Sequence, residues 1–347
     1  MFRRTLILLG CTLLVGVLLT AAAFGGHERS RTRFVIQVGG KYGYIDRSGR
    51  VVIPPKYDIA WNFTEGLAAV YLGSRPGHID RAGFIDETGK LVIPMRFQYA
   101  VAFAEERAAI QLDDKWGFIE RSGQFVVRPR YDRVQNFSEG FAAVELGDKW
   151  GFIDHSGREA IAPQDDDTAG FGEGLAGVWQ HGKCGFINRE NEVVIGFRFD
   201  ECRGFHGGPS PVRVGKQWGY INKEGEFVIP PTYEDAWTYS EGLAPVKLDG
   251  RWGYIDASGE VVTVPQFEDG APRYSIGTFS EGLAEVKIGS QWGFINKEGQ
   301  VVIPPYFVAA FGFSNGLAEV WDPECAYIDT SGNTVWTANH DSGVDGW

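Results

Sequence analysis

One stretch of the sequence carries residue types that bind metal ions. His181, Cys184, Cys202 and His206 follow the spacing His-x2-Cys-x17-Cys-x3-His, and two thiolates with two imidazoles form a tetrahedral ligand set for zinc. However, Cys184 stands where most repeats of this chain carry an aromatic residue, and Cys202 where several carry Ala. We therefore favour buried thiols. A Cys184–Cys202 disulfide, which an exported protein permits, ranks second, and a zinc site ranks third.

A second candidate for metal chemistry is Asp165-Asp166-Asp167. Three consecutive carboxylates resemble part of a calcium loop, but the alternating ligands and the Gly of an EF-hand loop are missing. A solvated charged turn is expected instead. The chain has no nucleophile elbow, glycine-rich phosphate loop or dinucleotide fingerprint. We predict no catalytic residues, no cofactor-binding residues, no metal-binding residues and no cofactor.

The elements that hold these residues belong to a tandem repeat. An aromatic residue followed by Gly recurs at intervals of 34 residues, or of 40 where an insertion of six intervenes, and Phe-x-Glu-Gly-Leu-Ala recurs in step with it. Two markers in the same phase indicate one repeated unit rather than chance. The Gly of the first marker is Gly43, Gly83, Gly117, Gly151, Gly185, Gly219, Gly253 and Gly293, with Ala326 in the ninth place.

Each unit is predicted to form three short strands. "GFAAVEL" is the first, a hairpin turn at Gly147-Asp148 follows, and "KWGFID" is the second. A turn at 155–157 leads to an apolar third strand that often ends in Pro. Trp116 and Phe118 should share one face of their strand, while Gly117 lets a neighbouring strand approach. The aromatic-Gly motif is thus interpreted as part of a wall rather than of an active site.

The repeated carboxylates also have a structural interpretation. One Asp per unit stands three residues before a Gly, as a turn requires, and Asn takes its place at Asn188, Asn222 and Asn296. Asn cannot act as a general base, so this position is not expected to be catalytic. The marker Glu is replaced by Gly207 and Asn315 in two units. It is expected to bond turn amides.

These motifs resemble the WG (KWG) β-repeat family of bacterial proteins. The resemblance rests on "KYGYIDRSG", "KWGFIERSG", "KWGFIDHSG", "QWGYINKEG", "RWGYIDASG" and "QWGFINKEG", and covers about residues 34 to 336. It implies an all-β repeat scaffold and transfers no catalytic residues. Trp is absent from "AGFID", "CGFIN" and "CAYID", so those units are expected to pack differently.

The array of about nine units could be open or closed. Propeller blades are four-stranded and usually have about 40 residues or more, which a three-stranded unit of 34 residues does not reach. The array also begins and ends in phase, with "RFVIQV" and "GNTVWT". We therefore expect an open β-array or solenoid, capped by its atypical terminal units, in preference to a closed β-propeller.

The N-terminus indicates export. Arg3 and Arg4 precede an apolar run from Leu6 to Leu19 and then small residues, which is the layout of a secretory signal, although the run is also nearly long enough for a membrane anchor. Lipidation of Cys11 is a third alternative. The predicted domains are 1–33, signal peptide or anchor; 34–337, WG-type repeat; and 338–347, tail. The expected location is extracytoplasmic, in the periplasm or at the cell surface.

The formal net charge of -12 disfavours nucleic acid and anionic lipid headgroups as partners. We expect an exported, non-enzymatic scaffold that binds a macromolecule, most plausibly protein. Binding of carbohydrate or cell wall through exposed aromatic residues is the alternative, and an enzyme ranks last. The exposure of Trp61, Trp179, Trp237, Trp321 and Trp336 should discriminate between protein and glycan. Insertions at 73–83 and 268–277 are candidate recognition loops, but we favour tolerated surface insertions.

Overall fold

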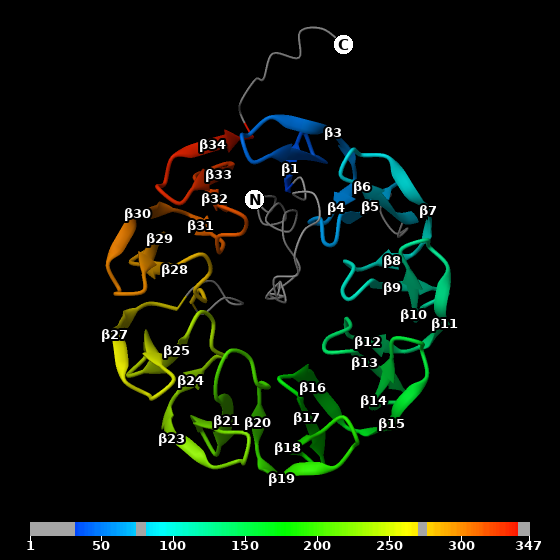
Figure 1. Cartoon of the computed structure of the whole chain (residues 1–347). Helices are drawn as coiled ribbons and strands as arrows, with labels where there is room; N and C mark the ends of the chain where they lie inside the picture. Colours follow the sequence, from blue (N-terminus) through cyan, green and yellow to red (C-terminus); the bar gives the residue numbers. More distant parts are fainter. Residues whose placement is uncertain (1–31, 74–80, 270–275, 339–347) are drawn as a thin grey trace, which may run out of the picture.

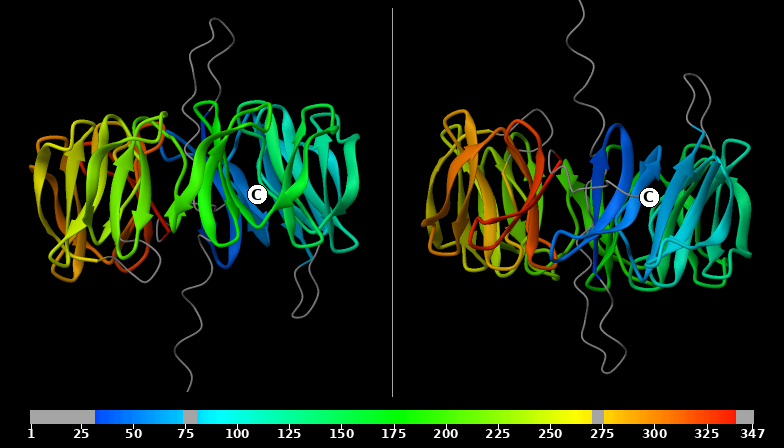
Figure 2. Two further views of the ribbon diagram at one scale, coloured as in Figure 1. Left: turned by 90° about the horizontal axis from the view of Figure 1, so that it is seen from below. Right: turned by 90° about the horizontal axis from the view of Figure 1, so that it is seen from above.

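The computed structural model is a closed ring of nine small antiparallel sheets, a nine-bladed β-propeller (Figure 1). It describes residues 32–73, 81–269 and 276–338. Within those ranges every regular element is a strand. The strands run between the two flat faces of the ring, as the side views show (Figure 2). The all-β prediction is confirmed.

The blades follow one another in chain order, and we number them from the N-terminus. Blades 1 to 3 contain β1 (Arg33–Val38), β2 (Lys41–Asp46), β3 (Val51–Tyr57), β4 (Ile59–Ala60), β5 (Leu67–Leu72), β6 (Arg81–Asp86), β7 (Leu91–Phe97), β8 (Tyr99–Ala100), β9 (Arg107–Leu112), β10 (Lys115–Glu120) and β11 (Phe125–Tyr131). Blades 4 to 6 contain β12 (Arg133–Val134), β13 (Phe141–Leu146), β14 (Lys149–Asp154), β15 (Glu159–Asp165), β16 (Asp167–Gly172), β17 (Leu175–Gln180), β18 (Lys183–Ile187), β19 (Val193–Phe199), β20 (Glu201–Cys202), β21 (Ser210–Val214), β22 (Gln217–Ile221) and β23 (Phe227–Tyr233).

Blades 7 to 9 contain β24 (Asp235–Ala236), β25 (Leu243–Leu248), β26 (Arg251–Asp256), β27 (Val261–Phe267), β28 (Leu283–Ile288), β29 (Gln291–Asn296), β30 (Val301–Phe307), β31 (Ala309–Ala310), β32 (Leu317–Trp321), β33 (Cys325–Asp329) and β34 (Thr334–Thr337). Among the described residues, blades 1 and 8 have three strands and the other seven have four.

The prediction of three strands per unit missed the innermost strand. In most blades this strand has only two residues, such as β4 and β8, and it lies between the last predicted strand of one unit and the first predicted strand of the next. A four-stranded blade therefore fits into 34 residues because its inner strand is very short. Two residues are too few to show the alternation by which strands are recognised in a sequence.

The hydrophobic core lies between blades rather than inside each one. An aromatic residue of each second marker packs on an aromatic residue of the preceding blade. Phe137 meets Phe118 with ring centroids 5.0 Å apart, and Phe103 meets Phe84 at the same distance. Such ring pairs stabilise by about 0.5–1.5 kcal/mol beyond the area that they bury. The repeated Phe is thus the contact that joins successive units.

The expectation of an open array is wrong, because blade 9 packs on blade 1. Phe34 lies 5.5 Å from Tyr327, measured between ring centroids, and both belong to one buried cluster with Leu317 and Trp336. A side chain on Gly49 of blade 1 would collide with the backbone of Val335 of blade 9. Gly89 of blade 2 likewise lies against the preceding blade, where it faces the side chain of Ile53. The terminal units therefore contact each other and do not cap an open end.

The expectation of an open array rested on the observation that the first and last units are in phase with the repeat. A ring closed by a blade built from both chain ends would begin out of phase, but here the described strands of each terminal blade are consecutive in the chain. The N-terminal segment that we expect to direct export, the tail, and the central parts of both insertions (74–80 and 270–275) lie outside the described residues. Within the described part of the chain no helix is long and apolar enough to cross a membrane.

Candidate interaction surface

The aromatic-Gly motif belongs to the packed interior of the blades rather than to an active site, as predicted. Phe118 is almost fully buried and Trp116 is half-buried. A Cβ on Gly117 would collide with the carbonyl oxygen of Val127 on the neighbouring strand β11. The same collision, with the residue equivalent to Val127, occurs at Gly43, Gly83, Gly151, Gly185, Gly219, Gly253 and Gly293. Since these positions leave no room for a ligand, the motif contributes packing rather than a binding site.

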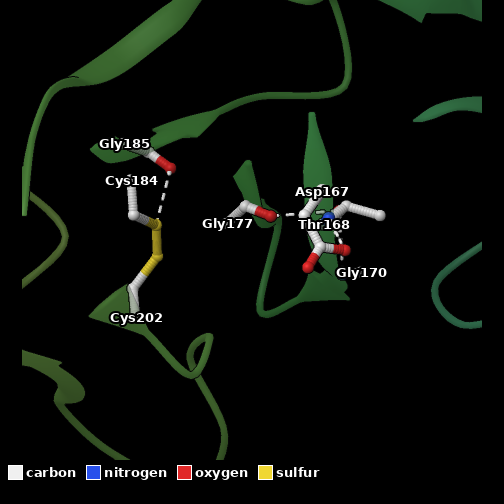
Figure 3. Close-up of a disulfide and its surroundings, with 7 residues drawn as sticks. All are labelled: Asp167, Thr168, Gly170, Gly177, Cys184, Gly185 and Cys202. Carbon is white, nitrogen blue, oxygen red and sulfur yellow. Dashed lines mark hydrogen bonds between the residues drawn. A yellow bond between two sulfur atoms is a disulfide. The ribbon is translucent and has the colours of Figure 1, made fainter. Parts of the chain in front are cut away.

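Cys184 and Cys202 form a disulfide between blades 5 and 6 (Figure 3). Their Cα atoms are 6.2 Å apart, and both residues are buried. The preference for free thiols at these positions was therefore wrong, and the second alternative is confirmed. Their sulfurs are not available to a metal, and no group of His, Cys, Asp and Glu in the described residues could hold one. Burial lowers the pKa of His206, and His181 bonds through its backbone amide to Asp166.

The three consecutive Asp residues do not form the solvated turn that we expected. Asp165 is 1% exposed and occupies the place of Tyr131 and Phe199 in the neighbouring blades. Its Oδ1 accepts a hydrogen bond of 2.7 Å from the amide of Gln180, whereas its Oδ2 is buried without a partner. Burial raises the pKa of Asp165. Only Asp166 behaves as a surface turn residue, because it pairs with Lys149 at 2.6 Å.

The Asp and Asn residues of the repeated turn have the predicted structural role. Asp154 Oδ1 accepts hydrogen bonds from the backbone amides of Ser156 at 2.8 Å and Arg158 at 3.1 Å. These bonds, with the Ser156 hydroxyl as the largest contributor, lower the pKa of Asp154 to about 2. Asn188 Oδ1 accepts the same pair of amides, from Glu190 and Glu192. The two residue types are therefore interchangeable at this turn.

The marker Glu bonds turn amides, but in the next blade rather than its own. Glu139 of blade 4 accepts hydrogen bonds from the amides of Glu173, through Oε1 at 2.5 Å, and Gly174, through Oε2 at 2.8 Å. A cation of that next blade, Arg189, lies 3.2 Å from Oε2 of the same carboxylate. These contacts lie on the face that carries the turns between the third and fourth strands, which we call the turn face (Figure 2). The sequence gives the residue type but not the blade that it contacts.

The opposite face carries an arrangement that sequence reasoning missed. We call it the tip face, because it holds the hairpin tips between the second and third strands of each blade. One aliphatic residue at the end of the second strand is exposed in five blades, and its exposed fraction lies between 38% and 45%. These residues are Val38, Leu72, Leu146, Val214 and Ile288. Their signal was an apolar residue at the same place in seven of the nine repeats, beside a turn.

Ion pairs accompany these aliphatic residues on the tip face. Asp132 pairs with Lys115 of blade 3 and accepts a hydrogen bond of 2.9 Å from the Gly147 amide at the tip of blade 4. The pair lowers the pKa of Asp132, and the Lys115 hydrogen bond is the largest cause. Asp58, Asp166 and Asp200 connect neighbouring blades in the same way. The tip face therefore carries both exposed apolar side chains and ion pairs that connect neighbouring blades.

The Trp residues outside the regular motif are mostly covered. Trp336 is 6% exposed, and Trp61, Trp179 and Trp321 are half-buried. Trp237 is 38% exposed, but its ring packs on the guanidinium of Arg203 at 4.1 Å. Arg203 also contacts Trp218 at 4.2 Å and pairs with Asp235 at 3.0 Å. Trp237 thus serves a contact between blades 6 and 7.

The nine blades and the residues that join them define a repeat β-propeller. The family model for the WG containing repeat matches residues 42–75, 83–116, 116–150, 150–184, 185–218, 218–252, 252–292 and 292–320. The chain belongs to this family, so the predicted resemblance is confirmed. No curated protein matches the sequence.

Two solved structures share the fold. A eukaryotic initiation factor aligns with a TM-score of 0.61 at 12% identity, over 88% of this chain and 95% of that one. The dihydro-heme d1 dehydrogenase NirN, in complex with DHE, aligns with a TM-score of 0.50 at 13% identity, over 89% of this chain and 73% of that one. At these identities the likeness concerns the fold alone.

Proposed function

We propose that this protein is an exported, non-enzymatic scaffold that binds another protein through its tip face. The observation that carries the proposal is the set of exposed aliphatic residues on that face, one in each of five blades. Apolar side chains bordered by charged pairs are typical of surfaces that bind proteins. Repeat scaffolds use such extended surfaces for recognition.

The exposure of the Trp residues favours protein over glycan as the partner. Sugar rings stack on open aromatic faces, but four of the five discriminating Trp residues are buried or half-buried, and Arg203 covers part of the fifth. The repeated carboxylates support a non-enzymatic role, because Asp154 and Glu139 are engaged with turn amides. A general acid or base would need such a group free to reach a substrate.

Export is supported by the buried Cys184–Cys202 disulfide. Disulfides form and persist in oxidising compartments outside the cytoplasm. The proposal therefore combines this bond with the signal-like segment at 1–33 and places the protein in the periplasm or at the cell surface. Whether that segment is cleaved or kept as an anchor would be measured as the intact mass of the protein in the soluble and membrane fractions of its host.

A site-specific photo-crosslinker tests the proposed surface. Benzoylphenylalanine at Leu146 or Val214 places the reactive group on the tip face, and the same residue at Ala162, which is exposed on the outer strand β15, is the matched control. Irradiation of host cells should give one protein adduct that forms from both tip positions and not from Ala162. A Leu146→Glu substitution should abolish the adduct formed from Val214, since it puts a charge into the apolar contact.

Two outcomes would contradict the proposal. Equal adducts from the tip positions and from Ala162 would mean random collision. Adducts that are degraded by glycosidases, and not by proteases acting on the attached partner, would favour the carbohydrate alternative.

A further inference from the structure

The turn face holds a row of carboxylate-binding turns. In each, the marker Glu of one blade accepts a hydrogen bond from one or two backbone amides of the next blade's marker turn. The distances lie between 2.5 and 3.1 Å for the amides of Glu106, Gly140, Glu173, Gly174, Gly207, Glu281, Gly282 and Gly316. Six of these turns, in blades 3, 4, 5, 6, 8 and 9, are therefore filled from within the protein.

The turn of blade 7 has the same backbone but no carboxylate. Glu241 has a φ of 50° and Gly242 of 88°, against 51° for Glu173 and 89° for Gly174 in the filled turn of blade 5. The residue of blade 6 that should supply the carboxylate is Gly207. The backbone amides of Glu241 and Gly242 thus have the conformation that binds a carboxylate in the other blades, but no carboxylate of blade 6 reaches them.

Two further observations indicate that the turn of blade 7 is accessible to a ligand. Gly242 is exposed, whereas Gly140, Gly174, Gly282 and Gly316 in the filled turns are half-buried. A cation accompanies the carboxylate in four filled turns, as Arg121, Arg189, Lys223 and Lys297, and Ala257 takes its place in blade 7. Among the boundaries at which both blades carry a described marker turn, the carboxylate and its cation are therefore both missing only between blades 6 and 7.

We propose that the amides of Glu241 and Gly242 form a binding site for one carboxylate of a protein partner. The site lies on the turn face, so it is separate from the tip face and goes beyond the proposed function. The two amides bind both oxygens of a carboxylate in the turns of blades 5 and 8. A phosphate is disfavoured, because the accompanying cation is absent and the chain is acidic.

The full-length protein with carbonyl-13C glutamate and 15N glycine gives a direct readout. Only a Glu-Gly peptide bond joins a 13C-labelled carbonyl to a 15N-labelled amide, and the sequence has seven Glu-Gly pairs. Their glycines are Gly66, Gly140, Gly174, Gly225, Gly242, Gly282 and Gly299. The probes are acetate, a blocked peptide with a central Asp, its Asn counterpart, and a neutral peptide with either a free or an amidated C-terminus.

The expected result is a saturable downfield shift of the Gly242 amide proton with acetate and the Asp peptide, and none with the Asn peptide. A response to the free C-terminus instead of the Asp peptide would identify a chain terminus as the source of the carboxylate. Gly174 and Gly282 should not shift, because their amides are already bonded to Glu139 and Glu241.

Glu139→Ala provides the matched variant, because it empties the turn of blade 5 without touching blade 7. The Gly174 amide should then respond to acetate as Gly242 does. The proposal is overturned if Gly242 does not shift, or if every labelled Gly shifts equally. It is also overturned if Glu139→Ala leaves Gly174 silent in a protein with an otherwise unchanged spectrum, because the turn would then have no affinity for a carboxylate.

Discussion

The hydroxyl of Tyr327 in blade 9 donates a hydrogen bond of 2.8 Å to the carbonyl oxygen of Val35 in blade 1, across 292 residues of sequence. Tyr44 makes a bond of the same type from blade 1 to the Trp61 carbonyl of blade 2, at 2.9 Å, although Trp61 follows the innermost strand β4 and Val35 lies in β1. The boundary that closes the ring therefore uses the same type of contact as a boundary between consecutive blades. Five blades carry Phe at this place and form no such bond.

Tyr327→Phe should lower the free energy of unfolding by about 1 kcal/mol, because it removes one hydrogen bond and leaves the ring packing in place. Urea denaturation measures the change. Tyr44→Phe is the matched control and should cost a similar amount. If Tyr44→Phe destabilised the protein and Tyr327→Phe did not, the closure between blades 9 and 1 would be absent in solution.

Loss of the Cys184–Cys202 disulfide should lower the free energy of unfolding by about 3 kcal/mol, as expected for a loop of this length. Cys184→Ser with Cys202→Ser in one protein, compared by denaturation with the oxidised parent, measures the loss. Cys325→Ser is the control, because Cys325 is a buried cysteine outside this disulfide. A parent whose stability does not respond to reductant would show that the bond does not form.

Asp154→Ala should lower the free energy of unfolding by about 1 kcal/mol, since two turn amides and the Ser156 hydroxyl lose their acceptor. Asp154→Asn should cost less than half of that, because Asn188 fills the same role in blade 5. Thermal unfolding at neutral pH compares the two variants. Equal losses would contradict the interchange of Asp and Asn on which we excluded catalysis here.

The Asp154 turn also predicts how the stability of the protein changes with pH. The pKa of Asp154 is lowered from 3.8 to about 2 in the folded protein. Its contribution to stability is therefore present above pH 3.8 and is lost as the pH falls towards 2. The difference in stability between the parent and Asp154→Asn should accordingly shrink on acidification over that interval.

Glu285 should give stability a pH dependence of the opposite sign. Burial raises the pKa of Glu285 from 4.5 to about 7, and its Oε2 is buried without a hydrogen-bond partner. The folded state thus holds the proton more tightly than the unfolded chain, so stability is full below pH 4.5 and falls as the pH rises through 7. Glu285→Gln should raise the free energy of unfolding at pH 8 by up to about 3 kcal/mol.

Denaturation of Glu285→Gln and its parent at pH 5 and pH 8 checks this expectation. The gain should be present at pH 8 and much smaller at pH 5. Glu190→Gln, on an exposed turn, is the control and should change little at either pH. A gain for Glu285→Gln that does not depend on pH would mean that the carboxyl is not the cause.

The sequence alone determined the local structure of this protein. The aromatic-Gly motif, the Asp-to-Gly turns and the alternation of strands depend on residues a few positions apart, and the structure has Gly117 and Asp154 in the predicted roles. Repetition supported these assignments, because Asn takes the place of Asp at the same turn in three units. The family followed from the same residues.

Only the tertiary structure decided how the units meet. Closure depends on the small rotation between successive blades, summed over nine of them, and no single unit encodes that sum. The partner of Glu139 lies in the next blade, and the Cys184–Cys202 bond spans two blades, so neither is a property of one repeat. The burial of Asp165 and the open turn at Gly242 likewise depend on which residue a neighbouring blade places against them.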